Sequence, residues 1–164
     1  MTTNAEKAYE TMKATEGQSE GTGEWFEVSQ DLINTFADAT HDHQFIHVDP
    51  ERAASMSPWG TTIAHGFLTL SLLTHLVGSM RREGGDGERA PRMDGLMMGV
   101  NYGFDKVRFV NPVKSGSRVR ATGVTKAVEL KGNAINVTRT ITVEIDGEDK
   151  PALVADWITR LVFS

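Results

Sequence analysis

The chain has 164 residues, no cysteine and a formal net charge of −5 at pH 7. This length fits one domain with a substantial core, and the lack of cysteine excludes disulfides, thiolate metal ligands and a cysteine nucleophile. Lys and Arg form no block of the kind that attracts nucleic acid or a membrane surface, so we expect neither as a partner. The start of the chain does not resemble a signal peptide, which predicts a cytoplasmic protein.

Residues 1–23 are polar and small, so we expect a flexible N-terminal extension that holds at most a short helix over residues 5–14. The domain itself is expected over residues 24–164, beginning with a short strand over 24–28. Ser29 is a typical N-cap, and the apolar spacing after it predicts an amphipathic helix that ends near Ala39. Asp49 and Pro50 predict the start of another short helix.

The most apolar segment follows, with no Asp, Glu, Lys or Arg between Arg52 and Arg81. From Phe67 to Met80 apolar side chains cover nearly every direction of a helix, which predicts a buried central helix that starts near Gly66. The unbroken run is about 14 residues, short of the roughly 20 that a membrane span needs. Residues 83–92 are rich in glycine and charge, which predicts a flexible connector.

Beyond the connector the apolar period changes to two, which predicts strands over residues 96–102, 105–110, 118–130, 134–145 and 152–163. Arg139 interrupts the apolar face of the fourth of these strands. Neither the central helix nor the strands could bury their apolar surface alone. The pattern therefore predicts a single α+β domain in which a curved antiparallel sheet wraps around a long central helix.

A cluster of ionisable residues lies just before the apolar segment: His41, Asp42, His43, His47 and Asp49. The simplest interpretation is a solvated polar loop. A metal site at His43 and His47 is a second, but no third ligand is indicated and Pro50 disfavours a long helix here. In a third interpretation, Asp42 and His47 converge on one water and act on it as general acid and base.

The start of the central helix offers a further component. Its first turn has free backbone N–H groups, so the amide of Gly66 could bind an oxygen on which negative charge develops. Glycine also permits a close approach of a ligand. A plain helix start that needs a small residue explains Gly66 equally well, and His65 is interpreted as a packing or capping residue without a catalytic part.

Two motifs carry a resemblance to a known family. Residues 36–50, FADATHDHQFIHVDP, and residues 60–70, GTTIAHGFLTL, resemble the MaoC-like hydratases, and most closely the branch of nodulation protein N-like acyl dehydratases. The family signature has Asp, usually Asn-Pro, an aliphatic residue and His, with Ile-Ala-His-Gly downstream. Residues 101–109, NYGFDKVRF, with Asn111-Pro112-Val113 also look like the family, so the resemblance runs from about Trp25 to the C-terminus.

This resemblance implies a hotdog fold, a homodimer and (R)-specific hydration of trans-2-enoyl-CoA thioesters, or the reverse dehydration. Asp42 and His47 would hold and activate the water that adds at C3, and Gly66 N–H would bind the thioester oxygen. Thr74 matches a hydroxyl position near the family's catalytic Asp. The family's chemistry needs neither a metal nor an organic cofactor.

The motif also departs from the family pattern. Gln44 stands in place of the usual Asn and can still form hydrogen bonds in support of the loop. Phe45 replaces the usual Pro, and His41 stands where Gly is more common, which affects the mouth of the pocket. Two alternative functions stay open: a dehydratase of acyl-carrier-protein thioesters, and a binding or regulatory protein without turnover. The cations that could meet a carrier protein or CoA phosphates are Arg81, Arg82, Arg89 and Arg92.

Overall fold

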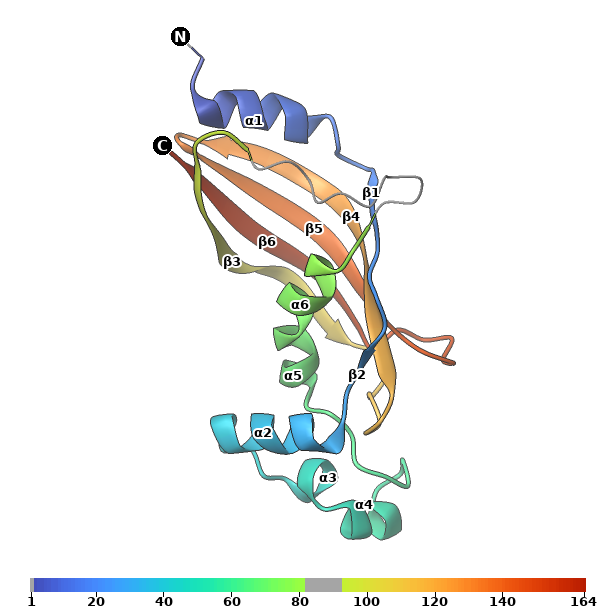
Figure 1. The fold of residues 1–164 in the computed structure, drawn as a ribbon. Helices are drawn as coiled ribbons and strands as arrows, with labels where there is room; N and C mark the ends of the chain where they lie inside the picture. Colours follow the sequence, from blue (N-terminus) through green and yellow to red (C-terminus); the bar gives the residue numbers. More distant parts are fainter. Residues whose placement is uncertain (1, 82–92) are drawn as a thin grey trace.

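The computed structural model describes residues 2–81 and 93–164, so the expected connector at 83–92 lies outside the described part. One antiparallel sheet has the order β1-β4-β5-β6-β3, and β2 also pairs with β4 (Figure 1). The strands are β1 (Ser19–Thr22), β2 (Phe26–Glu27), β3 (Leu96–Phe109), β4 (Arg118–Lys131), β5 (Ala134–Ile145) and β6 (Leu153–Phe163). The helices are α1 (Asn4–Lys13), α2 (Gln30–Thr40), α3 (Phe45–Val48), α4 (Pro50–Met56), α5 (Gly66–Ser71) and α6 (Leu73–Gly78).

The sheet curves around α5 and α6, which lie against one of its faces, and α2 to α4 gather at one end of the molecule (Figure 1). Alternate residues of the long strands, such as Val119, Val143 and Leu153, are buried in one core with Leu73 and Leu76 of α6. This arrangement confirms the predicted α+β hotdog fold. Among the described residues, no helix is long and apolar enough to cross a membrane.

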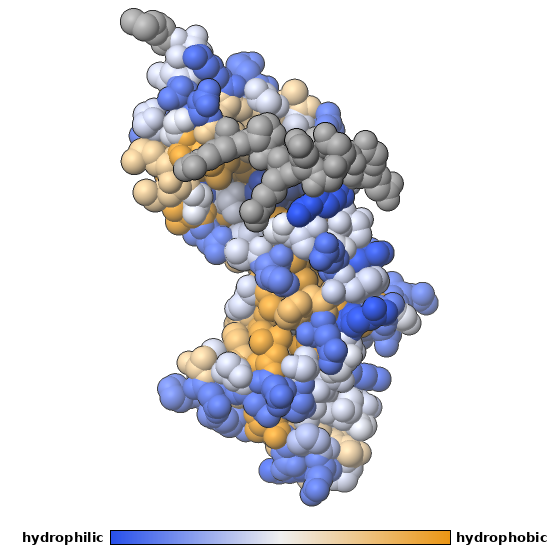
Figure 2. Space-filling view, viewed as in Figure 1, coloured by the Kyte–Doolittle hydropathy of each residue, from blue (hydrophilic) through white to orange (hydrophobic). Residues whose placement is uncertain are grey.

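The central helix differs from the prediction in two ways. It is divided at Leu72 into α5 and α6, although the Leu72 amide still bonds to the Leu68 carbonyl. It is also not buried on all sides, because Phe67 is 67% exposed and Thr74 is exposed as well. One face of the helix packs on the sheet, and the other is open in a single chain. Figure 2 shows hydrophobic residues gathered at the centre of this face, where α5 and α6 lie.

The N-terminal segment is more regular than the expected loose extension. Helix α1 starts with a capping box, in which the Thr3 side chain accepts from the Glu6 amide and Glu6 accepts from the Thr3 amide. Ala5 and Ala8 are buried in a second hydrophobic cluster beside Phe163 of β6. Strand β1 pairs with β4 and extends the sheet. The two small alanines let α1 pack closely on the sheet, which composition alone does not reveal.

Strand β3 is continuous over Leu96–Phe109, where the sequence predicted two strands. Its pairing with β6 shifts register at three points, between Leu96 and Met98, Asn101 and Gly103, and Phe104 and Lys106. Such bulges break the alternation of apolar and polar residues. The sequence pattern therefore predicts a break between two strands at a point where β3 is continuous. Strand β3 lies at the edge of the sheet.

Arg139, which interrupts the apolar face of β5, forms an ion pair with Glu20. Arg139 Nε donates to both carboxylate oxygens of Glu20, each at 2.9 Å, and its Nη1 donates to the Thr159 hydroxyl at 2.7 Å. The Thr125 hydroxyl donates to Glu20 as well. A partly buried guanidinium is tolerated on the inner face because its hydrogen bonds are met.

Candidate active site

The loop that carries Asp42 follows directly from the end of α2. The chain turns at His41, which has a left-handed backbone conformation with φ of 61°. Non-glycine residues seldom adopt this conformation. Glycine would adopt this conformation without the steric cost that His41 meets. The turn leads the chain into the exposed Asp42 and then into α3, which brings His47 into the interior.

His47 is held in one tautomer by the backbone. Its Nδ1 lies 2.7 Å from the carbonyl oxygen of Ile63. A carbonyl only accepts hydrogen bonds, so Nδ1 carries the proton and Nε2 keeps a free lone pair in the neutral ring. Burial lowers the pKa of His47 below its ordinary value and the neighbouring His65 adds to the lowering, while the hydrogen bond to Ile63 and, more weakly, the charge of Asp42 oppose it. His47 thus has the features of a neutral general base.

His65, which the sequence indicates only as a packing or capping residue, completes a cluster with Asp42 and His47. Its Nε2 lies 2.9 Å from the backbone oxygen of Asp42 and 4.0 Å from the carboxylate oxygen Oδ2. Its ring stacks on that of His47, with centroids 3.8 Å apart and an angle of 25° between the planes. The position of His65 directly before Gly66, within the Ile-Ala-His-Gly motif, is the signal that could have pointed to it.

One ligand atom from each of Asp42, His47 and His65 lies within 4.8 Å of the others, so a metal ion has to be considered. The Nε2 of His65 is already engaged by the Asp42 carbonyl, and in-plane lone pairs of two stacked rings do not converge on one point. His43, the other expected ligand, lies elsewhere with its Nε2 2.8 Å from Asp38. The geometry therefore favours proton transfer over metal binding.

The remaining predicted residues lie at different distances from this cluster. Gly66 is the first residue of α5, next to His65, and a Cβ there would lie 3.0 Å from the Phe109 ring. Gln44 is the N-cap of α3, and its backbone oxygen accepts from the His47 amide at 2.9 Å. Thr74 is exposed on α6, eight residues after Gly66, or roughly 12 Å along a helix at 1.5 Å per residue. The described contacts join Gln44 and Gly66 to the cluster but not Thr74.

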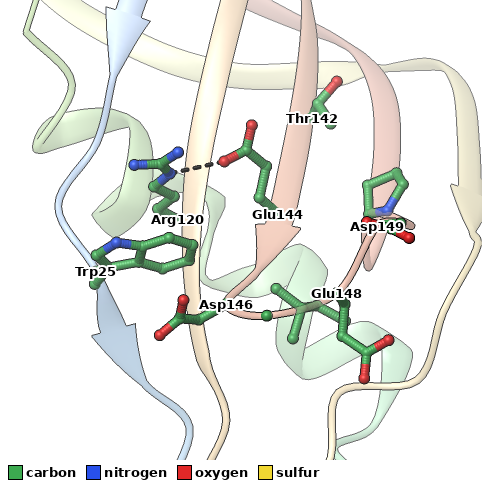
Figure 3. Close-up of a pocket in the computed structure, with 10 residues that line it drawn as sticks. Trp25, Arg120, Thr142, Glu144, Asp146, Glu148 and Asp149 are labelled. Carbon is green, nitrogen blue, oxygen red and sulfur yellow. Dashed lines mark hydrogen bonds and ion pairs between the residues drawn. The ribbon is translucent and has the colours of Figure 1, made fainter.

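A separate pocket of about 370 Å³ lies at the ends of β4 and β5 (Figure 3). Its lining includes Trp25, Arg120 and Glu144, and none of the candidate residues. The Arg120 guanidinium lies 4.4 Å from the Trp25 ring centroid and donates to Glu144 at 2.7 Å. Arg118 is paired with Asp146 in the same way. The lining of this pocket contains no histidine, so it offers no neutral base comparable to His47.

Comparison with known proteins agrees with the sequence motifs. Residues 11–146 match the family described as MaoC like domain. Nodulation protein N of Rhizobium leguminosarum bv. viciae is 53% identical over 148 residues, which cover 90% of this chain and 86% of that protein. The 3-hydroxyacyl-thioester dehydratase Z of Mycobacterium tuberculosis (strain ATCC 25618 / H37Rv) is 47% identical over 152 residues, or 92% and 93% of the two chains. The chain therefore belongs to the MaoC-like dehydratase family, and it is an enzyme of the hydro-lyase class.

Solved structures agree with the fold. The MaoC-like dehydratase from Rhodospirillum rubrum has a TM-score of 0.67 at 19% identity, covering 91% of this chain and 93% of that one. The (R)-hydratase from A. caviae involved in PHA biosynthesis has a TM-score of 0.61 at 22% identity, covering 87% and 93%. At such identities these matches establish the shared hotdog architecture but not the substrate of this chain.

The lowered pKa of His47 makes the stability of the protein depend on pH. The unfolded imidazole titrates near 6.5 and the folded one lower, so between the two values the unfolded chain binds more protons. His47 contributes stability that is fully present above the unfolded pKa and is lost as the pH falls through the folded pKa. Urea unfolding measures the free energy of unfolding of wild type and of His47→Gln. The difference between the two proteins should shrink as the pH falls from about 8 to about 5. A constant difference would contradict a buried neutral His47.

Proposed function

We propose that the protein catalyses (R)-specific hydration of trans-2-enoyl-CoA to (R)-3-hydroxyacyl-CoA, or the reverse dehydration. The observation that carries this proposal is the free Nε2 of His47 beside Asp42, at the start of α5. A carboxylate and a neutral imidazole that converge can orient one water and accept its proton. The name of the mycobacterial relative, a 3-hydroxyacyl-thioester dehydratase, supports a thioester substrate.

In this mechanism a water held by Asp42 and His47 adds to C3 of the substrate. Its oxygen forms the bond to C3 while its proton passes to Nε2 of His47, and the electron pair of the C2–C3 double bond moves through C1 to the thioester oxygen. The carboxylate of Asp42 stabilises the imidazolium that results. The enolate then collapses, its carbonyl re-forms, and C2 takes up the proton from His47. Every atom of the water is thus found in the product.

The negative charge of the enolate needs a hydrogen-bond donor at the thioester oxygen. We assign this role to the backbone N–H of Gly66, since the first turn of α5 leaves N–H groups without partners inside the helix. Gln44 supports the site through its backbone bond to His47. Thr74 stays a prediction as a hydroxyl that assists Asp42, because the described contacts of a single chain do not bring it to the cluster.

We further propose that two copies of the chain form a homodimer along β3. This strand is an edge of the sheet, and several of its large apolar side chains are exposed: Met97, Met98, Val100, Tyr102, Phe104 and Phe109. A long apolar edge strand invites pairing with another strand. A second copy would also cover Phe67 and the open face of α5. Sedimentation equilibrium should give twice the chain mass of 18.0 kDa, and a monomer mass at micromolar concentration would contradict the proposal.

Acyl-carrier-protein thioesters are the alternative substrate. Of the four cations considered for contact with a carrier or with CoA phosphates, Arg82, Arg89 and Arg92 lie outside the described residues. The Nη1 atom of Arg81 donates to the backbone oxygens of Gly78 and Met80 at the end of α6. Since this bonding holds Arg81 close to its own helix, it favours neither partner, and both thioesters are tested in the same assay.

Replacing Asp42 with Asn tests the proposed chemistry, because the amide nearly conserves shape but carries no negative charge to stabilise the imidazolium of His47. We expect hydration of crotonyl-CoA or a longer trans-2-enoyl-CoA, followed by the loss of enoyl absorbance, to fall about 100- to 10,000-fold. Asp38→Asn is the matched control, since Asp38 is an exposed carboxylate of α2 that pairs with His43 outside the cluster.

Wild-type rates in Asp42→Asn would refute the part that Asp42 takes in holding the water and stabilising the imidazolium. A folded wild-type protein that turns over only the carrier-protein thioester would support the alternative substrate. Tight binding of acyl-CoA without turnover of either thioester would instead support a binding or regulatory role.

A further inference from the structure

The buried histidine directly before Gly66 links three parts of the candidate site. The ring of His65 is 3% exposed and lies between the ring of His47 on α3 and that of Phe36 on α2, whose centroid is 5.0 Å away. Its Nε2 reaches the backbone oxygen of Asp42 at 2.9 Å. One side chain therefore contacts the loop of the proposed carboxylate and the ring of the proposed base, and its residue is the N-cap of the helix that carries the proposed oxyanion donor.

The hydrogen bond limits the tautomers that the His65 ring can adopt. Because the Asp42 carbonyl can only accept, Nε2 carries a proton. The other nitrogen, Nδ1, is buried and has no hydrogen-bond partner among the described residues. A proton on Nδ1 would give a buried cation without an acceptor, so the neutral ring with a bare Nδ1 is the form that fits. Burying a bare acceptor also costs free energy, which a residue needed only for packing would avoid.

The neutral state of His65 suits the chemistry proposed for His47. When His47 takes the proton of water it becomes a cation, and a second cation stacked 3.8 Å away would oppose that step. A neutral aromatic ring instead supports the plane of His47 without a competing charge. Together with the bond from Nδ1 to Ile63, the stack restricts rotation of the His47 ring and keeps its Nε2 directed toward one place.

We propose that His65 is a positioning residue of the hydration site, which holds the Asp42 loop through its Nε2–H and the plane of His47 through ring stacking. This inference rests on the function proposed above. Its role is distinct from catalysis, because the one hydrogen bond of its side chain among the described residues goes to the backbone and its other nitrogen is buried. Loss of either contact would misplace a catalytic group while leaving the group itself present.

Two substitutions separate the two contacts. His65→Phe keeps an aromatic ring for the stack and removes the donor, whereas His65→Gln keeps an N–H donor for the Asp42 carbonyl and removes the ring. We expect kcat of His65→Phe to fall about 10- to 100-fold with KM within about threefold of wild type, the effect of a group displaced by about an ångström. His65→Gln should recover part of the loss. The matched control is His75→Phe on α6, which removes an exposed histidine whose ring contacts Phe26 away from the cluster.

A spectroscopic measurement tests the inference independently of turnover. Long-range ¹H–¹⁵N correlation of the imidazoles at neutral pH should show His65 with its proton on Nε2 and His47 with its proton on Nδ1. In His65→Gln the signals of His47 should indicate a mixture of tautomers or ring orientations. Thermal unfolding of each variant shows whether it is folded, so loss of fold is not mistaken for loss of positioning.

The outcomes separate this inference from the proposed function. If wild type shows no hydration, the proposed function fails whatever the NMR spectra show. If wild type hydrates the substrate and folded His65→Phe keeps its kcat, the positioning role is refuted and the proposed function stands. A His65 protonated on Nδ1, or on both nitrogens, would also refute it.

Discussion

The hydrogen bond from His47 to the carbonyl oxygen of Ile63 is the interaction on which the site depends. It selects the tautomer with a free Nε2, and without it the imidazole could present either a donor or an acceptor to water. The carbonyl is itself fixed, because the Ile63 amide bonds to Ile46 at 2.9 Å and the Ala64 amide bonds to Val113 at 2.7 Å. The segment before α5 is thus tied to α3 on one side and to the loop before β4 on the other.

Burial of α5 and α6 on the sheet makes that segment a rigid support. Leu68, Leu73 and Leu76 are almost fully buried against the inner face, so the helix is anchored along its length. Because His65 and Gly66 stand at the start of the same helix, their position follows from packing several residues away. The exposed loop of Asp42 has little packing of its own, and its main described link to this support is the bond from His65.

The outline of this fold could be predicted from the sequence because long strands and an apolar helix have strong periodic patterns. The N-caps at Ser29 and Asp49 were confirmed for the same reason, since capping is a local interaction. The bulges of β3 and the exposed side of α5 were missed, because both depend on partners distant in sequence or on a surface open in a single chain. The packing of α1 on the sheet was not predicted, because its two buried alanines carry a weak apolar signal.

Prediction of the site was limited in a similar way. Asp42 and His47 lie five residues apart, so their pairing could be inferred from one motif, and the structure brings them together. His65 lies 23 residues from Asp42, and its contact with the Asp42 backbone oxygen leaves no trace in the spacing of side chains. The tautomers of both histidines depend on backbone carbonyls, which no residue pattern identifies. Thr74 was placed by resemblance alone, and the contacts of one chain do not support it.

We propose that this site adds water across the double bond of an enoyl thioester. The product then has the (R) configuration at C3. The most direct measurement is to convert a trans-2-enoyl-CoA in D₂O and determine the configuration at C3 and the deuterium content at C2 of the product. The proposed mechanism predicts (R)-3-hydroxyacyl-CoA with one deuterium at C2, as water supplies both the hydroxyl group and the new hydrogen. An (S) product, or release of free CoA without a hydroxyacyl product, would contradict it.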